Sequence, residues 1–213
     1  MPVTVVIPTL NEEHHVAAAV RSAFDAGASE VIVVDGGSSD ATVQVARDAG
    51  ARVLAGERMR AKQLNLGARE ARHAAIIFLH ADTLLPRGAA EAVVNARADF
   101  GGFRIAFAER SLRLRWTAFA INLRTHITRQ PWGDQAQFVD RKAFPGFREI
   151  PIMEDYDLAR RMKRRTILPL TVITSGRRFL EKGLLRTSAI NWLTIARYHL
   201  GADPEALARR YRK

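Results

Sequence analysis

The first 98 residues alternate between short runs of apolar, β-branched residues and longer stretches with helical periodicity, an order that few folds accommodate. Strands are expected at 3–9, 30–36, 51–56 and 74–82, and helices at 12–27, 38–50, 59–73 and 86–98. Because the strands are apolar throughout, the pattern predicts an α/β fold, with a mostly parallel sheet covered by helices on both faces. The loops that follow parallel strands share one edge of the sheet, where ligands bind.

The second half of the chain has a less regular pattern. Strands are expected at 99–107, 133–141 and 166–175, and helices at 109–128, 151–165, 188–201 and 203–213. No internal repeat and no low-complexity linker divides the chain. We therefore predict a single domain over 1–213.

The composition limits the compartment and the partners. The 213 residues include no cysteine, which excludes disulfides and thiolate chemistry. The N-terminal residues lack a basic stretch before their first acids, and no apolar run approaches the ~20 residues that cross a bilayer, so a cytoplasmic protein is expected. The net charge of +11 favours an anionic partner such as nucleic acid, anionic lipid or a phosphate-bearing substrate, although a solvated basic face explains it as well.

Acidic residues occur where the expected strands end or the helices begin. These residues are Glu12, Glu13, Asp35, Asp82, Glu154 and Asp155. The preference of acids for helix N-termini explains each one taken alone. Together they place carboxylates around one edge of the sheet, and in a basic protein such an edge suits a divalent cation held beside a phosphate.

Asp35 ends a strand in the segment VIVVDGGSSDAT, which covers 31–42. Gly36 and Gly37 allow a tight turn and the close approach of a ligand. Ser39 or Asp40 is expected to cap the helix that follows. The segment therefore predicts a ligand contact at Asp35.

Four segments, in this order along the chain, resemble the family 2 glycosyltransferases, which have the GT-A fold: VVIPTLNEE, VIVVDGGSSDAT, FLHADTLLP and MEDYDLARRM. With QLNLGA, WGDQAQFV and EIPIMED, they resemble a small bacterial subgroup labelled as glycosyltransferases of arsenosugar biosynthesis. The resemblance implies inverting transfer of a sugar from a nucleotide-diphosphate sugar, typically UDP-linked, to the hydroxyl of a small-molecule or lipid-linked acceptor. The Q-x-x-R-W signature of processive synthases is missing, which favours single transfers.

The resemblance divides the domain into a nucleotide-sugar half of about 1–98, an acceptor and catalytic half of about 99–187, and C-terminal helices over 188–213. The donor contacts that it implies are Pro8, Thr9, Glu12, Asp35, Arg60, Gln63, Asn65 and Ala81. Asp35 suits uracil or ribose, because a carboxylate accepts hydrogen bonds from an imide N–H or a hydroxyl. For Arg60, the polar start of a solvent-facing helix is an equal alternative.

The segment His80–Asp82 occupies the position of the family's DxD motif, which binds Mn²⁺ or Mg²⁺ between the two phosphates. Asp82 occupies the position of the last acid of this motif. One carboxylate, together with phosphate and water, can hold a hard cation. His80 replaces the first acid. Imidazole is tolerated by Mn²⁺ better than by Mg²⁺, and His80 could also support Asp82 indirectly.

The ED pair of the family takes the proton from the acceptor hydroxyl. We assign this base to Asp155, with Glu154 orienting or contacting the acceptor and Asp157 as the rival base. The loop over the donor sugar and the acceptor corresponds to Trp132, Gly133, Asp134 and Gln135, although a tryptophan before a glycine is equally common as a hydrophobic plug. Arg177 or Arg178 could close over the phosphates.

The expected helices at 110–128 and 188–200 carry Trp116, Phe119, Trp192 and Tyr198 beside arginines. Packing of these apolar faces on the domain is the more common arrangement. The alternative is shallow attachment to the inner face of an anionic membrane, with a lipid-linked acceptor.

Two other classes of protein compete with a glycosyltransferase. A nucleotidyltransferase should show a glycine-rich phosphate loop soon after the first strand, where this chain has PTLNEEHH. A non-catalytic basic module for nucleic acid or membrane explains the charge, but it gives Asp35, Asp82 and Asp155 no common purpose. We therefore expect no nucleic-acid partner, and the sequence leaves the oligomeric state open.

Overall fold

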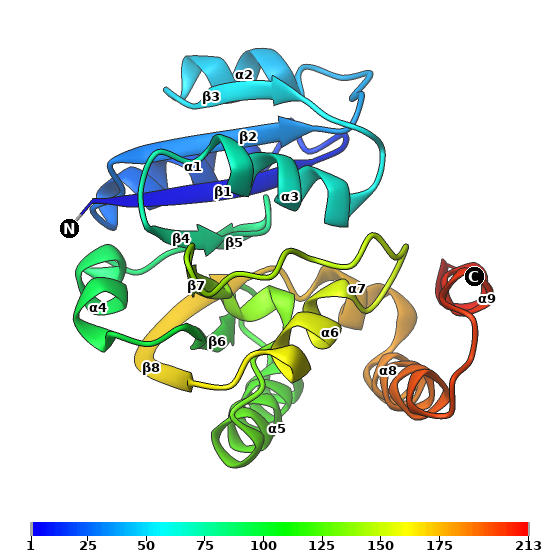
Figure 1. Ribbon diagram of the computed structural model, residues 1–213. Coiled ribbons are helices and arrows are strands. Elements are labelled where there is room, and N and C mark those ends of the chain that lie inside the picture. The colour runs from blue at the N-terminus through cyan, green and yellow to red at the C-terminus, as the bar shows by residue number, and fades with distance from the viewer. Residues whose placement is uncertain (1, 213) are drawn as a thin grey trace.

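The computed structural model describes residues 2–212, apart from the side chains at positions 178, 182, 184, 185 and 212. The N-terminal half alternates strands and helices along the chain (Figure 1). Its elements are β1 (Val3–Thr9), α1 (Val16–Asp25), β2 (Glu30–Asp35), α2 (Thr42–Asp48), β3 (Arg52–Ala55), α3 (Arg60–Glu70), β4 (Ala75–Phe78), β5 (Thr83–Leu84) and α4 (Ala89–Ala96).

The second half supplies the remaining strands and the longer helices. Its elements are β6 (Phe100–Phe107), α5 (Leu112–Thr128), the 3₁₀ helix η1 (Gly133–Gln135), β7 (Phe138–Asp140), α6 (Glu154–Arg161), β8 (Arg165–Thr174), α7 (Arg177–Lys182), α8 (Leu184–His199) and α9 (Pro204–Arg212). In Figure 1, α5 and α8 form the end of the molecule opposite α2 and β3.

Within the described residues the strands form one sheet of eight in the order β3-β2-β1-β4-β7-β6-β8-β5. The first four neighbours, β3 to β4, are parallel, as are β6 and β8. β7 is antiparallel to both β4 and β6, and β5 is antiparallel to β8. The expected mostly parallel α/β sheet is confirmed, and the short antiparallel β7 joins its two parallel parts.

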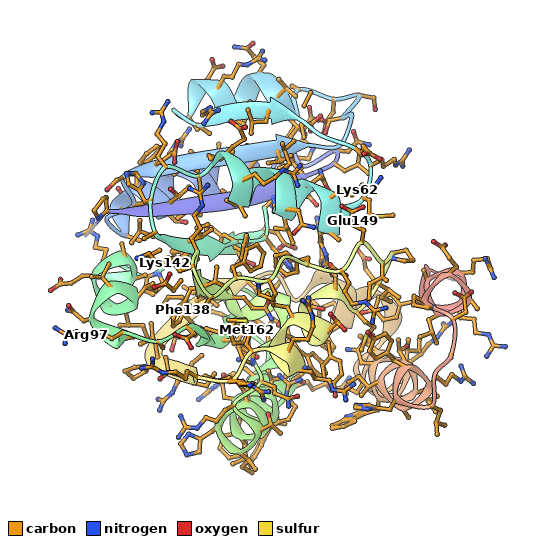
Figure 2. All side chains as sticks on the ribbon, in the orientation of Figure 1. Lys62, Arg97, Phe138, Lys142, Glu149 and Met162 are labelled. Atoms are coloured by element: carbon orange, nitrogen blue, oxygen red, sulfur yellow. The ribbon has the colours of Figure 1, made fainter. Side chains whose placement is uncertain are left out.

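Two hydrophobic clusters cover the two faces of the sheet because side chains alternate along each strand. One face packs on α1 and α4 through residues such as Val5, Val20 and Val93. The other packs on α3 and α6 through residues such as Val6 and Leu158. Figure 2 shows Phe138 inside the molecule, whereas Arg97 and Lys142 extend outward.

The structure corrects several expected boundaries. The strand expected at 133–141 is a 3₁₀ turn followed by a three-residue strand. Two short elements were not expected: α7, which begins at Arg177, and β5. The helix expected from 12 begins at Val16, and the backbone N–H groups of residues 11–13 donate to side chains of residues 38–42, which follow β2.

Candidate active site

Asp35 organises the loop at the end of β2. Its Oδ1 accepts hydrogen bonds from Thr9 Oγ1 at 3.1 Å and Ser38 Oγ at 2.5 Å, and its Oδ2 accepts from the backbone N–H groups of Gly37 and Ser38. The side chain is buried. These bonds fix the turn at 36–38, and Asp35 is not among the residues that line the cavity described next.

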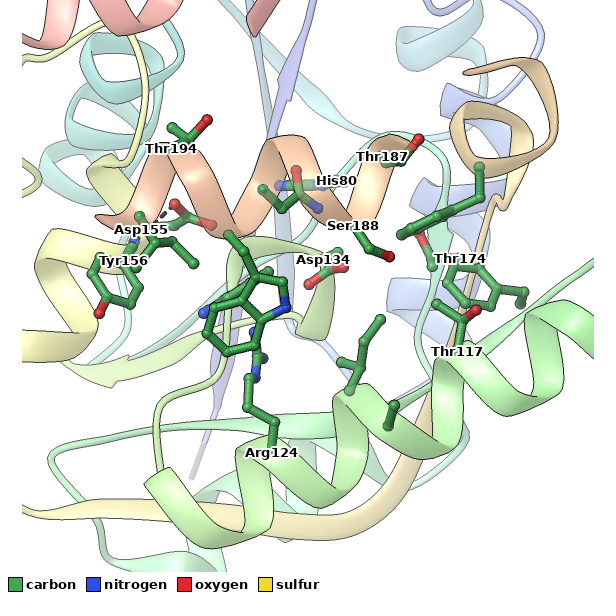
Figure 3. Close-up of a pocket in the computed structure, with 18 of the residues that line it drawn as sticks. His80, Thr117, Arg124, Asp134, Asp155, Tyr156, Thr174, Thr187, Ser188 and Thr194 are labelled. Carbon is green, nitrogen blue, oxygen red and sulfur yellow. Dashed lines mark hydrogen bonds between the residues drawn. The ribbon is translucent and has the colours of Figure 1, made fainter. Parts of the chain in front are cut away.

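A cavity of about 860 Å³ opens where the end of β4, the loop before β7 and the start of α6 face α5 and α8. Figure 3 shows Arg124 reaching into it from α5, and Thr187, Ser188 and Thr194 on α8 across from it. Its polar lining includes Arg60, His80, Asp82, Asp134, Asp155 and Arg177. Its apolar lining includes Phe107, Trp116, Ile121, Trp132, Ile152, Met153 and Ile195.

The carboxylate of Asp155 is held in this cavity by two backbone donors. The N–H of Gly133 donates to Oδ2 at 2.6 Å, and the N–H of Tyr156 donates to Oδ1 at 2.8 Å. A Cβ atom on Gly133 would lie 2.9 Å from both Asp155 Oδ2 and His80 Nε2. A larger residue at this position would therefore force the carboxylate and the imidazole to shift.

His80 and Asp82 follow β4 and both line the cavity. Burial, reinforced by the positive charge of Arg60, lowers the pKa of His80 to about 4, so its imidazole is neutral at physiological pH. Arg177 NH2 lies 3.4 Å from Asp82 Oδ2 and 3.1 Å from Glu12 Oε1. The guanidinium thus links the loops after β1 and β4.

Arg60, the first residue of α3, reaches the cavity beside α6. Its Nε donates to Oε1 of Glu154, a residue that is buried and does not line the cavity. The charges of Glu154 and Asp155 outweigh the effect of burial and raise the pKa of Arg60 above its usual range. Glu154 therefore pairs with Arg60 and lies outside the cavity lining.

The segment that begins at Trp132 contributes different side chains to the cavity and to the core. Trp132 lines the cavity, with the guanidinium of Arg124 3.5 Å from its ring centroid. Asp134 also lines it, and burial raises the pKa of this carboxyl to about 6. Gln135 is fully buried: its Oε1 accepts from Thr125 Oγ1, and its Nε2 donates to the Phe103 carbonyl.

Several sequence-predicted donor residues lie outside the cavity lining. Gln63 Nε2 donates to the carbonyls of Thr9 and Val34, which ties the ends of β1 and β2 together. Asn65 pairs through both ends of its amide with the backbone of Phe147. Pro8, Thr9 and Ala81 are also buried and absent from the lining.

The rival base, Asp157, is separated from the cavity by its own contacts. It is buried and accepts hydrogen bonds from Arg161 Nε at 2.7 Å and from Tyr198 at 3.0 Å. The structure thus brings together Asp155, His80, Asp82, Arg60 and the loop at Gly133, and it leaves Asp157 in a separate ion-pair network.

The sequence analysis missed Arg124 and the polar residues of α8 that line the cavity, Thr187, Ser188, Asn191 and Thr194. An arginine on an amphipathic helix is ordinarily solvated, and nothing in the sequence shows that it stacks on Trp132. Arg178 was an alternative to Arg177, but its side chain lies outside the described residues.

The protein has a mostly parallel α/β sheet, and charged residues gather beyond the carboxyl ends of its strands. Ligands of such α/β proteins bind at that edge of the sheet. The sequence profile described as Glycosyl transferase family 2 matches residues 4–149. The chain therefore belongs to this family. Glycosyltransferase AglJ of Haloferax volcanii is 42% identical over 52 residues, which are 24% of this chain and 17% of that protein.

Solved structures support the GT-A fold. S. aureus TarS 1–349 superposes with a TM-score of 0.63 at 16% identity over 92% of this chain and 65% of that one. Glucosyl-3-phosphoglycerate synthase from Mycobacterium tuberculosis, in complex with Mn²⁺, uridine diphosphate and glucosyl-3-phosphoglycerate, gives 0.58 at 20% identity over 81% of this chain and 70% of that one. The arsenosugar subgroup gains no support from these comparisons and stays a prediction.

Proposed function

We propose that this protein is an inverting, non-processive glycosyltransferase that moves a sugar from a UDP-linked donor to an acceptor hydroxyl with the help of a divalent cation. The proposal rests on the observation that Asp155, His80 and Asp82 line the same cavity. TarS has been solved with UDP-GlcNAc and the mycobacterial synthase with UDP-glucose, which supports a UDP-linked donor.

Asp155 acts as the general base in this proposal. Two backbone N–H groups orient its carboxylate and leave further lone pairs for the acceptor hydroxyl. Attack from the side of Asp155 and departure of the nucleotide on the opposite side invert the anomeric centre. Trp132 offers an apolar surface to a sugar, while Arg60 and Arg177 place positive charge where a diphosphate would gain negative charge.

The residues at the end of β4 fit a divalent cation. Glu12 Oε2 is buried without a hydrogen-bond partner in the described residues, and Arg177 already places a positive charge between Glu12 and Asp82. The neutral imidazole of His80 has a free electron pair to offer. No cluster of three or more potential ligands occurs in the described part of the chain, so phosphate oxygens and water would complete the coordination.

Asp82 would hold Mn²⁺ or Mg²⁺, with His80 as a nitrogen ligand or as a support for Asp82. When bound, the ion supplies Lewis-acid stabilisation of the leaving diphosphate. Gln63, Thr9 and Asp35 shape the end of the sheet against which the nucleoside would lie. Direct donor contacts by these residues, and by Pro8, Asn65 and Ala81, remain predictions.

Thermal unfolding with UDP and Mn²⁺ tests the proposal without knowledge of the acceptor. At a ligand concentration of about 100 times Kd, the stabilisation of about 2.7 kcal/mol should raise the Tm by roughly 5–10 °C. Either component alone should do much less. Asp82→Ala should abolish the shift, whereas Asp48→Ala, an exposed carboxylate on α2, should keep it. If UDP does not stabilise the protein but GDP, ADP or TDP does, the UDP-linked donor is contradicted; if none of these compounds stabilises it, the proposed transfer fails.

A further inference from the structure

An apolar stripe on α5 faces solvent. Its residues are Leu112, Trp116, Phe119, Leu123 and Ile127, with exposed fractions between 48% and 72%. The opposite face of α5 is the one that packs on the domain: Leu114 and Ala118 are buried, and Asn122 makes two hydrogen bonds to the backbone of Ile105 in β6. The stripe is therefore a second apolar face, beyond the one that the fold uses.

A second exposed apolar surface lies on α8 and on Leu200, the residue that directly follows it. Trp192, Leu193 and Leu200 are 59%, 53% and 87% exposed. Trp116 of α5 and Trp192 of α8 both line the cavity while remaining largely exposed, so they flank its mouth. We call the eight exposed apolar residues of these two helices the α5–α8 rim. Figure 1 shows both helices at the same end of the molecule.

The two helices that carry the rim contain no acidic residue. The sequence has no acid between Glu109 and Asp134, nor between Glu181 and Asp203. These stretches instead carry exposed arginines at positions 110, 113, 115, 129, 186 and 197. Exposed aromatic and aliphatic residues edged by arginine, without acids, are typical of helices that lie in the interface of an anionic bilayer.

A second copy of the chain fits the rim poorly. Two copies that bury this surface against each other would bring arginines of both chains together, which is unfavourable without acids to pair with them. An anionic lipid surface is complementary in charge and also accommodates the apolar stripe.

We propose that the α5–α8 rim docks on a bilayer that contains anionic lipid. If the proposed glycosyl transfer holds, the acceptor is an amphiphile in that bilayer whose hydroxyl enters the cavity between the two helices. Ile121, Ile152 and Ile195 line this cavity with apolar side chains, and Asp155 lines it as well. No helix among the described residues is long and apolar enough to cross a membrane, so attachment of this part of the chain is peripheral.

Co-sedimentation with vesicles tests the docking directly. The full chain should bind vesicles of phosphatidylglycerol and phosphatidylcholine, bind pure phosphatidylcholine at least about tenfold more weakly, and lose binding as salt rises. The pair Phe119→Ser with Ile127→Ser, neither of which lines the cavity, should weaken binding by about tenfold or more. Phe24→Ser, an exposed aromatic on α1, is the matched control and should bind as the parent does.

Charge gives an independent variant if the serine pair fails to fold. Arg115→Gln with Arg129→Gln should lower affinity for anionic vesicles by roughly tenfold. The docking proposal is overturned if the parent protein does not bind anionic vesicles. It is also overturned if Phe24→Ser loses as much vesicle binding as the serine pair does. A parent that is dimeric and a serine pair that is monomeric, with no vesicle binding by either, would instead identify a protein interface. Stabilisation by UDP and Mn²⁺ is measured separately, so failure of docking and failure of the proposed function are distinguishable.

Discussion

Asp155 and Asp157 are two positions apart at the start of α6, yet their surroundings differ. Asp155 lines the cavity and accepts from two backbone N–H groups, whereas Asp157 pairs with Arg161 and Arg148 outside it. The same carboxyl group therefore faces the cavity at one position and belongs to an ion-pair network at the other.

Asp155→Asn should lower the turnover number by about 10²–10⁴-fold, because the amide cannot accept the proton of the acceptor hydroxyl. Asp157→Asn is the matched control on the same helix and should reduce thermal stability while keeping turnover within a few-fold. Both are measured as UDP release together with a melting curve. Equal loss of turnover in the two variants would contradict the assignment of the base.

The carboxyl group of Asp134 predicts a pH effect on stability. Burial raises its folded-state pKa to about 6 from 3.8, so between these values the folded protein holds a proton that the unfolded chain has released. The free energy of unfolding therefore falls as pH rises from about 4 to 6 and levels off above. Asp134→Asn should reduce this pH-dependent fall in the free energy of unfolding by up to about 3 kcal/mol. Urea denaturation at several pH values measures the fall. Parallel pH profiles for the variant and the parent would rule out this origin.

At the scale of elements, single side chains hold loops that the sheet does not reach. Asn65 of α3 binds the segment before α6 through two hydrogen bonds, of 2.8 and 2.9 Å, to the backbone of Phe147. Arg60, on the same helix, holds Glu154 at the start of α6. α3 therefore sets the position of the helix that carries the proposed base.

Asn65→Ala should lower the free energy of unfolding by about 1–3 kcal/mol, since it leaves a backbone N–H and a carbonyl of Phe147 without partners. Urea denaturation measures the loss, and Gln44→Ala, on the exposed surface of α2, controls for removal of an amide. Unchanged stability with weakened UDP binding would show instead that Asn65 contacts the donor.

Across the whole molecule, the C-terminal helix completes the wall beside the proposed base. Leu207 and Ala208 of α9 are buried in one cluster with Ile152 and Met153, which immediately precede α6. Tyr211 of α9 also lines the cavity. The segment before α6 and the C-terminal helix are thus packed in one cluster.

Leu207→Ala should destabilise the protein by about 2–3 kcal/mol, because it leaves a cavity in this small cluster. It should also lower the turnover number more than it changes the affinity for UDP, since the cluster adjoins Asp155 and not the end of β1. Urea denaturation and UDP titration separate the two effects. A loss of UDP affinity equal to the loss of turnover would contradict this coupling.

Much of the fold was predictable from local pattern. The bounds of β1 match the expected 3–9, and β2 and β3 lie within a residue of theirs, because each is an apolar run followed by residues that end a strand. The expectation that the aromatics of α5 and α8 pack on the domain is wrong for Trp116, Phe119 and Trp192, which are exposed. A helical pattern shows that a helix has an apolar face, but not that two such faces exist or which one the sheet covers.

The sequence by itself determined the α/β architecture and the placement of acids near one edge of the sheet, since both follow from the order of short segments. Only the tertiary structure decided which acids face the cavity. Glu154 is buried against Arg60, 94 positions away, and Glu12 meets Arg177 across 165 positions. Such contacts depend on how helices and loops pack, because the direction and partners of a side chain are set by neighbours that are remote in sequence.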